Sequence, residues 1–469
     1  MVSNMIADVL PSLLYPKSVA VIGVTDTPDR VGYNVLESIV GGGFTGAVYP
    51  IHPRHQELQG RKVYKSLAEV PAAVDLAVIS LNEHLTVEAA EQCGRAGVKG
   101  LVCHAGGFRE TGETGQQLEK ELIAITQKYK MLLIGPNTLG FVNTDNHLNV
   151  TFFPMNIPPS KISIVCQSGG VGLNSIQLTI EEGVGLNKFI GVGNCSVLDV
   201  PDYLDYLEND PSTDVIGVYV EGVAQARKFV QTAARVARKK PVVVYKAGRI
   251  EGATQYTQTH TGAIAGSYRL YEEILHQHGI FTVDSTAEFV VALKALALQP
   301  LPQGNRIGVL THTAGPIVAT LDGMLSRACT LPTLSDATIK RIKQVMGTDS
   351  PPVVVKNPVD AVGLGFTREN FSGLAEVMLQ DDNIDLLVTF FVYHKYWNFP
   401  TEEIVEIAKK QNKPVMINLV GCWEDCRADQ LLAQKGGVPL YTLPEKTALA
   451  TAALVFYGKQ RKGGANFED

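Results

Sequence analysis

The stretch Lys161–Gly170 reads KISIVCQSGG, an apolar run that ends in a loop of small and polar residues. The same kind of opening occurs twice more, as SVAVIGVTD from Ser18 and as RIGVLTHTAG from Arg306. Each run has the continuous apolar character of a strand that is buried on both faces, and each loop leads into a helical pattern. The three openings therefore predict three similar units along the 469-residue chain.

Further apolar runs follow each opening, as alternating strands and helices require. The next runs are DLAVISL at Asp75, DVIGVYVEG at Asp214 and IDLLVTFFV at Ile384. Proline-rich stretches at residues 154–160 and 299–305 are typical of linkers. We therefore expect an α/β chain of three consecutive doubly wound domains with mostly parallel sheets, first Rossmann-like and then flavodoxin-like. The expected domains are residues 1–153, 161–298 and 306–469.

Composition excludes several classes of protein. The formal net charge is -6 and no stretch is strongly basic, which argues against a nucleic-acid-binding protein. No apolar run approaches the roughly 20 residues that cross a bilayer, and the N-terminus lacks the features of a signal peptide. We therefore expect a cytoplasmic protein without membrane association. Of the seven cysteines only Cys422 and Cys426 are close, at a spacing that matches no common metal motif, so we expect reduced thiols and no metal site.

The first unit offers a nucleotide site that does not suit a dehydrogenase. Its loop GVTDTPDRVG supplies Gly23 and Gly32 without the G-x-G-x-x-G spacing. The second strand, in GAVYPIHPRH, lacks the acidic residue that holds a ribose 2′-hydroxyl. It ends instead in His52, Pro53 and Arg54, which better suit an additional phosphate. An NAD-dependent dehydrogenase stays open as an alternative.

The second unit carries a histidine in a loop of small residues. His260 lies in YKAGRIEGATQYTQTHTGAIAGSY, residues 245–268, and no bulky apolar residue immediately precedes it. An isolated loop histidine is ordinarily just exposed to solvent, so this residue type alone indicates nothing. A neutral imidazole, with an ordinary pKa of about 6.5, can however act as a nucleophile at cellular pH. A phosphate bound to it would need N–H donors of the kind that a helix N-terminus supplies.

Taken in order, the motifs resemble those of the succinyl-CoA synthetase superfamily, in particular the alpha subunit of ADP-forming or other NDP-forming acyl-CoA synthetases. The resemblance rests on SVAVIGV, VYPIHPR and GPNTLGFVN in the first unit, on HTGAIAGS around His260, and on VVVKNPVD in the third unit. It extends from about Tyr15 to Tyr457. The resemblance implies that the first domain binds coenzyme A and that His260 carries a phosphoryl group. It also implies that Glu221, at a strand end, orients this histidine.

The resemblance further implies which residues hold each ligand. Two helix N-termini would bind the phosphate: Ser168, Gly169 and Gly170, and Thr313, Ala314 and Gly315. The CoA groove would contain five residues: Gly23, Thr25, Arg30, Pro53 and Asn137. Among the positions that depart from the family pattern, Thr138 replaces a cysteine, His312 an asparagine and Ala314 a glycine. His312 is a second candidate carrier, but its position between a strand and a helix favours His260, because a carrier must travel.

An acyl-CoA synthetase also needs a nucleotide site. The chain contains no G-x-x-x-x-G-K-S/T loop and no fourth region that would suit an ATP-grasp fold. The resemblance therefore implies that ATP or ADP, with magnesium, binds to an ATP-grasp beta subunit in a hetero-oligomer. The implied reaction interconverts acyl-CoA, ADP and phosphate with a small carboxylic acid, CoA and ATP, through an acyl phosphate and a phosphohistidine. A non-catalytic CoA-binding scaffold or sensor is the remaining alternative.

Overall fold

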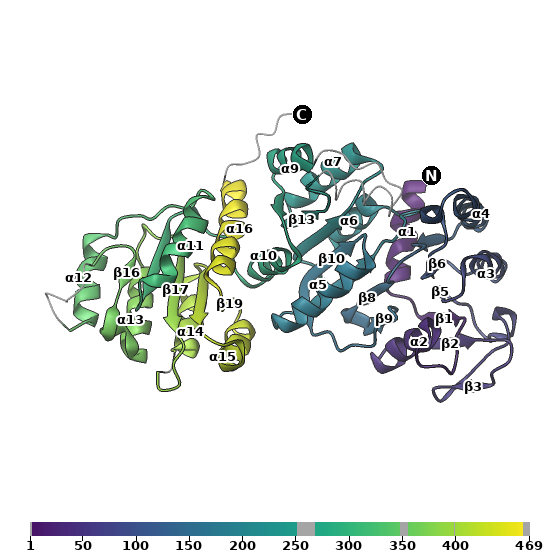
Figure 1. Ribbon diagram of the computed structural model, residues 1–469, viewed down its shortest axis with the longest axis horizontal. Helices are drawn as coiled ribbons and strands as arrows, with labels where there is room; N and C mark the ends of the chain where they lie inside the picture. Colours follow the sequence, from purple (N-terminus) through teal and green to yellow (C-terminus); the bar gives the residue numbers. More distant parts are fainter. Residues whose placement is uncertain (1, 251–267, 348–354, 398, 463–469) are drawn as a thin grey trace. The chain divides into compact units, whose positions relative to one another are not determined.

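The computed structural model describes residues 2–250, 268–347, 355–397 and 399–462. The chain folds into two compact units, residues 1–289 and 290–469, and each is described by itself. From here on, first unit and second unit mean these two parts and no longer the three units of the sequence. Two large sheets belong to the first unit and one to the second (Figure 1). All three sheets are mainly parallel, which confirms the predicted α/β class with consecutive parallel-sheet domains.

The first sheet has five parallel strands in the order β2-β1-β5-β6-β7. Every residue of β1, β5, β6 and β7 is buried, as expected for continuous apolar runs covered on both faces. Its elements are α1 Val2–Leu14, β1 Ser18–Ile22, α2 Val31–Gly41, β2 Ala47–Ile51, the hairpin β3 Glu57–Leu58 and β4 Arg61–Lys62, β5 Leu76–Ile79, α3 Glu83–Arg95, β6 Gly100–Cys103, α4 Glu113–Tyr129 and β7 Leu132–Ile134.

The second sheet has seven strands in the order β14-β13-β12-β10-β11-β8-β9. The strands from β14 to β11 are parallel, whereas β8 and β9 pair antiparallel at one edge. These two strands precede residue 153, so the end of the first expected domain hydrogen-bonds into the sheet of the second. The elements are β8 Phe141–Asn143, β9 Leu148–Asn149, β10 Pro159–Cys166, α5 Gly169–Glu181, β11 Leu186–Gly191, α6 Val200–Asn209, β12 Val215–Val220, α7 Ala226–Ala237, β13 Val242–Lys246, α9 Tyr268–Gln277, β14 Phe281–Val283 and α10 Thr286–Leu298.

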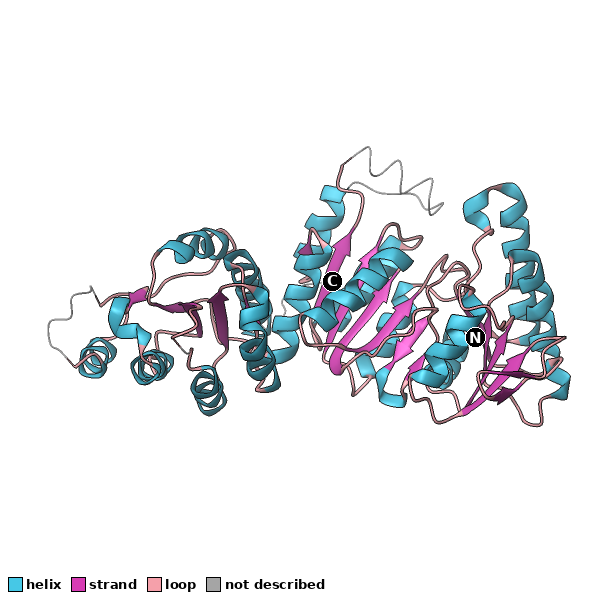
Figure 2. Cartoon of the chain, turned by 60° about the horizontal axis from the view of Figure 1, so that its bottom comes forward, coloured by secondary structure: helices cyan, strands magenta, loops and turns pink. Residues whose placement is uncertain are grey.

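The third sheet has five parallel strands in the order β16-β15-β17-β18-β19. Helices flank the strands of each sheet (Figure 2). The elements of the second unit are β15 Ile307–Thr311, α11 Gly315–Leu325, α12 Asp336–Val345, β16 Val359–Asp360, α13 Arg368–Leu379, β17 Leu386–Val392, α14 Thr401–Gln411, β18 Val415–Val420, α15 Trp423–Lys435, β19 Leu440–Tyr441 and α16 Pro444–Lys462. Over the described ranges, no helix is long and apolar enough to cross a membrane.

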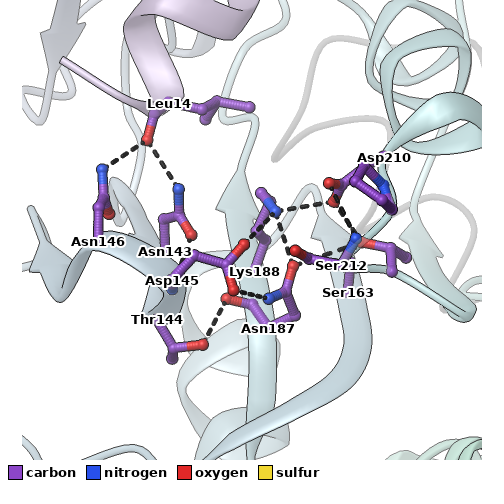
Figure 3. Close-up of polar contacts among 12 residues, drawn as sticks. Leu14, Asn143, Thr144, Asp145, Asn146, Ser163, Asn187, Lys188, Asp210 and Ser212 are labelled. Carbon is purple, nitrogen blue, oxygen red and sulfur yellow. Dashed lines mark hydrogen bonds and ion pairs between the residues drawn. The ribbon is translucent and has the colours of Figure 1, made fainter.

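A buried ion network lies at the edge of the second sheet that β11, β8 and β9 form (Figure 3). The fully buried Lys188 ammonium, on β11, donates to Asp210 and Asn187 at 2.7 Å each and lies 3.4 Å from Asp145. Burial lowers the pKa of Lys188, but the hydrogen bonds and charges of Asp210 and Tyr15 outweigh that effect and raise it. The lysine therefore stays charged inside the protein because carboxylates surround it.

The same network holds the N-terminal helix. The carbonyl of Leu14, at the end of α1, accepts hydrogen bonds from the side chains of Asn143 at 2.8 Å and Asn146 at 3.1 Å (Figure 3). Between these asparagines, Asp145 accepts from the side chain of Asn187 on β11 at 2.8 Å. The turn that leads from β8 to β9 is thus hydrogen-bonded both to the end of α1 and to β11, which fixes α1 to the second sheet.

Candidate functional site

Gln167 joins the ends of two neighbouring strands of the second sheet. The strands β10 and β12 are parallel, with Cys166 opposite Tyr219. The side-chain oxygen of Gln167 accepts hydrogen bonds from the main-chain N–H groups of Glu221 and Gly222, at 2.8 and 3.2 Å. The loop after β10 is thereby held beside the strand end that carries the predicted catalytic carboxylate.

Ser168 begins α5 as its N-cap residue. Its hydroxyl accepts a hydrogen bond from the N–H of Val171 at 3.4 Å. Gly169 and Gly170 form the exposed first turn, and a Cβ on Gly170 would meet no atom within 4 Å. The positive end of the helix dipole is therefore exposed at residues without side chains, where an anion can approach the backbone closely.

Glu221 is buried, and its carboxylate accepts a hydrogen bond from the Tyr219 hydroxyl at 3.3 Å. The main-chain carbonyl of Glu221 accepts a hydrogen bond from the buried Lys246 ammonium at 2.8 Å, and this ammonium also donates to the Ala247 carbonyl at 2.5 Å. Burial lowers the pKa of Lys246, and the negative charge of Glu221 opposes that shift. The ammonium thus fixes the backbone on which the Glu221 carboxylate is carried.

His260 lies outside the described residues, in the segment 251–267. The described chain leads to this segment from β13, the parallel neighbour of β12, and continues after it as α9. Arg249, before the segment, forms an ion pair with Asp284 at 2.8 Å, and the hydroxyl of Tyr268, after it, donates to the same carboxylate at 2.6 Å. One carboxylate, directly after β14, therefore contacts both flanks of the segment.

The motif GPNTLG, residues 135–140, lies against the same edge of the second sheet. The Thr138 hydroxyl donates to the carbonyl of Gly191, the last residue of β11, at 2.5 Å. It also accepts from the N–H of Gly140 at 3.0 Å. A Cβ on Gly169 would lie 3.8 Å from Leu139, so this motif adjoins the first turn of α5. Thr138, which departs from the family pattern, has a structural contact here.

The third sheet has a comparable helix start at α11. Its N-cap residue is Ala314, which has helical backbone angles and no side-chain capping bond. The N–H of Thr313 donates to the Thr311 hydroxyl at 2.9 Å, and that hydroxyl donates to the Thr313 carbonyl at 2.6 Å. Gly315 is exposed, and a Cβ there would meet no atom within 4 Å. The second predicted phosphate cradle is therefore a helix N-terminus without the hydroxyl cap that Ser168 provides.

His312 is fixed by its surroundings. The side chain is buried, and its Nε2 accepts a hydrogen bond from the N–H of Val392 at 2.8 Å. Burial lowers the pKa of the imidazole. The ring packs against three aromatic side chains with centroid distances from 4.4 to 6.4 Å: Phe366, Phe391 and Trp397. A group that carries phosphate between sites must move, so these contacts favour His260 over His312.

A cavity of about 550 Å³ lies at the carboxyl ends of β1, β5 and β6. The strand order of the first sheet reverses there, which is where open α/β sheets bind ligands. Gly23 has a φ of +90°, and a Cβ on it would lie 2.6 Å from the Ser80 carbonyl oxygen, so the turn requires glycine. Arg30 is the N-cap residue of α2, and its cation and this helix N-terminus together suit a phosphate. Three of the five residues predicted to bind CoA line the cavity: Gly23, Thr25 and Arg30.

The other two predicted residues adjoin the cavity lining. Pro53 is exposed and follows His52, which lines the cavity. Asn137 has a φ of +58°, and its side chain donates to that of Asn194 at 3.3 Å. A Cβ on Gly106, a residue of the lining, would lie 3.5 Å from the Asn137 side-chain oxygen. Their roles in binding stay predictions.

Four polar residues at these two places were missed by the sequence reasoning. Each ends or directly follows an apolar strand, which is the signal that would have identified them: Ser80, His104, Gln167 and Lys246. Within the described ranges, no three His, Cys, Asp or Glu side chains gather as a metal site. The geometry at the first sheet suits a nucleotide-like ligand. The geometry at the second sheet suits the binding of an anion.

Two family models match the first unit. A CoA binding domain matches residues 17–144, and a succinyl-CoA ligase like flavodoxin domain matches residues 159–296. The first range contains every residue of the cavity lining except Phe152, and the second contains the Ser168–Glu221 edge.

Curated relatives match nearly the whole chain. The acetate–CoA ligase (ADP-forming) II subunit alpha of Pyrococcus furiosus is 37% identical over 459 residues, which cover 96% of this chain and 98% of that one. The 4-hydroxybutyrate–CoA ligase (ADP-forming) of Nitrosopumilus maritimus is 32% identical over 94% of this chain, but this match covers only 63% of that longer protein. Among solved structures, the dinucleotide forming acetyl-coenzyme A synthetase 1 of Ca. Korarchaeum cryptofilum, in complex with phosphate and ADP, is 33% identical, with a TM-score of 0.90 and 97% coverage of both chains.

Proposed function

Because the chain belongs to the family of ADP-forming acyl-CoA ligases, as an alpha-type subunit with a CoA-binding domain, we propose that it transfers phosphate through His260. The overall reaction interconverts an acyl-CoA, ADP and phosphate with a carboxylic acid, CoA and ATP. The substrate class is a small carboxylic acid, since relatives are named for acetate and 4-hydroxybutyrate. A ligase family gives no support to the NAD-dependent dehydrogenase alternative.

One observation carries the proposal: Gln167 holds the Ser168 loop beside Glu221 through two hydrogen bonds of 2.8 and 3.2 Å. The loop supplies N–H donors for a phosphate, and the carboxylate can stabilise an imidazolium. The segment that contains His260 follows β13, which pairs with the strand that carries Glu221. All three groups that the chemistry needs therefore belong to one edge of the second sheet or to the chain that leaves it.

The reaction takes three steps, and each exchanges one bond for another. A phosphate oxygen first attacks the thioester carbonyl of acyl-CoA, the C–S bond breaks, and CoA leaves as a thiol with a proton from the phosphate. A neutral nitrogen of His260 then attacks phosphorus, and the carboxylate leaves as the P–O bond to the acyl group breaks. Finally an oxygen of ADP attacks phosphorus, the P–N bond breaks, and ATP forms. Positioning and electrostatic stabilisation supply most of the catalysis in such transfers.

Each residue that the sequence predicts for the site has a role in this scheme. Glu221 orients His260 and stabilises its charged form. CoA occupies the cavity of the first sheet, with its phosphates near Gly23, Thr25 and Arg30, and with Pro53 and Asn137 at its border. Phosphohistidine is held first at the α5 N-terminus and then at the α11 N-terminus: Ser168, Gly169 and Gly170, and Thr313, Ala314 and Gly315.

The nucleotide step belongs to a second subunit in this proposal. The chain covers 98% of a relative that is itself named subunit alpha. We propose a beta subunit of ATP-grasp fold, which binds ADP or ATP with magnesium and forms a hetero-oligomer with this chain. The proposed localisation is cytoplasmic.

Labelling of the histidine tests the proposed function. The chain is combined with an ATP-grasp subunit and with ATP labelled in its terminal phosphate. We expect acid-labile label on the wild type and on His312→Phe, and none on His260→Ala. Equal labelling of the wild type and His260→Ala would refute the assignment of His260.

A further inference from the structure

Ser80 and His104 form a polar pair in the wall of the cavity of the first sheet, and no prediction from the sequence included them. Ser80 follows β5 and His104 follows β6, so both lie at the carboxyl edge of the sheet. Both residues line the same cavity as Gly23, Thr25 and Arg30. The hydrogen bond between Ser80 and His104 determines whether the cavity wall can donate or accept a hydrogen bond at this place.

The hydrogen-bond partners of His104 determine its tautomer. Nε2 lies 3.0 Å from the carbonyl oxygen of Val150, which can only accept, so Nε2 must carry the proton. Burial lowers the pKa of His104 to about 4, and the bond to Val150 only partly opposes this, so the ring is neutral near pH 7. A neutral imidazole has one N–H, and Nδ1 is therefore an acceptor. Nδ1 lies 3.2 Å from the Ser80 Oγ, which must donate to it.

This arrangement leaves the Ser80 hydroxyl able to act only as a hydrogen-bond acceptor toward a ligand. A free serine hydroxyl can donate or accept as its proton rotates. The single proton of Ser80 is directed at His104, so only lone pairs of its oxygen are left for a ligand. At this place the cavity can accept a hydrogen bond but cannot donate one from Ser80. A phosphate oxygen, which also accepts, has no match here, whereas an N–H group does.

The cavity thus combines two different chemistries. Near Arg30 and the N-terminus of α2 it suits phosphate, and near Ser80 it suits a neutral N–H donor. Coenzyme A contains both kinds of group, phosphates on the nucleotide and two secondary amides in the pantetheine arm. Resting on the proposed function of this cavity, we propose that Ser80, held as an acceptor by His104, receives a hydrogen bond from a pantetheine amide N–H and so selects CoA over its nucleotide fragment.

A nucleophilic serine is the competing interpretation of a Ser–His pair. A general base must hold the serine proton during attack, and a ring that is protonated only near pH 4 holds it poorly. The second ring nitrogen is also bound to a neutral carbonyl instead of a carboxylate. Recognition is therefore the favoured role, and hydrolysis of an acyl-CoA becomes an outcome of the test.

Calorimetric titration of the full chain with two probes tests the inference. The probes are CoA and 3′-phospho-ADP, which lacks the pantetheine arm. We expect Ser80→Ala to weaken CoA binding about tenfold, the effect of one lost hydrogen bond, and to leave 3′-phospho-ADP binding unchanged. Unchanged binding of the fragment also shows that the variant is folded. His104→Phe frees the Ser80 proton, and we expect it to weaken CoA binding by less than Ser80→Ala does.

Three results would overturn the inference. Ser80→Ala could bind CoA as tightly as the wild type does, or lose affinity for both probes equally. Release of thiol from acetyl-CoA by the wild type, abolished in Ser80→Ala, would make Ser80 a nucleophile. Failure of the proposed function is a different result, because then the wild type binds neither probe.

Discussion

The start of α5 in the first unit and the start of α11 in the second share one construction but differ in chemistry. In the first, the Gln167 oxygen accepts the main-chain N–H of Glu221, and in the second, Nε2 of His312 accepts that of Val392. The registers of β10 with β12 and of β15 with β17 place these two pairs at equivalent positions. A side chain that joins two parallel strand ends is therefore common to both edges.

The reactive groups are not common to both edges. Where the second sheet has the Glu221 carboxylate, the third has the apolar Val392. Where Ser168 caps α5 with a hydroxyl, Ala314 provides no side-chain cap for α11. The connecting side chain thus supports the backbone at both places, whereas the chemistry depends on the residues that this backbone presents.

Glu221→Gln is expected to have the largest effect. The change keeps the shape and the ability to accept from the Tyr219 hydroxyl but removes the negative charge that faces a developing imidazolium. We expect the rate of histidine phosphorylation to fall roughly a hundredfold or more, with thermal unfolding near that of the wild type. The matched change Val392→Thr, also isosteric, should leave the rate within about twofold. A Glu221→Gln variant with the wild-type rate would remove the chemical difference between the edges.

The connecting side chains of Gln167 and His312 differ in how many main-chain N–H groups donate a hydrogen bond to them. Gln167→Leu leaves two main-chain donors without their acceptor, and His312→Phe leaves one. At about 1–3 kcal/mol for each partly buried donor, we expect Gln167→Leu to lower the free energy of unfolding by about 3 kcal/mol and His312→Phe by about 1.5 kcal/mol.

Denaturant unfolding measures both changes. Both tryptophans, Trp397 and Trp423, lie in the second unit, so their fluorescence reports on His312→Phe, while circular dichroism also follows the first unit. Gln167→Glu keeps an acceptor and serves as the control for Gln167→Leu. Equal losses for the two edges would show that the number of donors does not set the stability.

Gly170→Ala and Gly315→Ala compare the two helix starts as phosphate sites. A Cβ at either position meets no atom within 4 Å, so the protein tolerates both changes, and alanine favours the helix. A bound phosphate would still meet the added methyl group. We expect Gly170→Ala to raise the KM for phosphate about tenfold and Gly315→Ala to raise it about twofold. Initial rates of ATP formation measure this, and an equal effect at both positions would make the two cradles equivalent.

The fold could be predicted because its signal is local. Continuous apolar runs require cover on both faces, and ISIVC, VIGVYV and IGVLT lie in buried strands of the structure. The pairing of β8 with the second sheet could not be predicted, since residues 141–143 bond to a strand more than 40 residues away. The partners of Lys188 were hidden for the same reason. Its sequence GLNKFIG shows a lysine in a strand but not the distant Asp145 and Asp210 that neutralise it.

The site could be predicted only in part. Glycine and serine loops after strands indicated the α5 start and the turn at Gly23, because backbone geometry restricts the residues there. Polar residues whose role depends on a partner far along the chain were missed. Gln167 accepts from residue 221, and His104 is oriented by Val150, so neither role is visible from neighbours in sequence.

The smallest expected effect is a loss of folding stability at low pH. It should occur at the edge that contains His312 and not at the edge that contains Gln167, because only His312 titrates. Burial lowers the pKa of His312, against an opposing contribution from the charge of Asp360, whereas the unfolded chain has a histidine pKa near 6.5. The unfolded state therefore binds more protons below about pH 6.5, and the second unit should lose stability as the pH falls through that value. His312→Phe cannot take up this proton, so its tryptophan-monitored unfolding should depend less on pH between about 8 and 5.5. If the variant and the wild type lose stability in parallel, His312 is not the group responsible, and the acid sensitivity of this edge lies elsewhere in the unit.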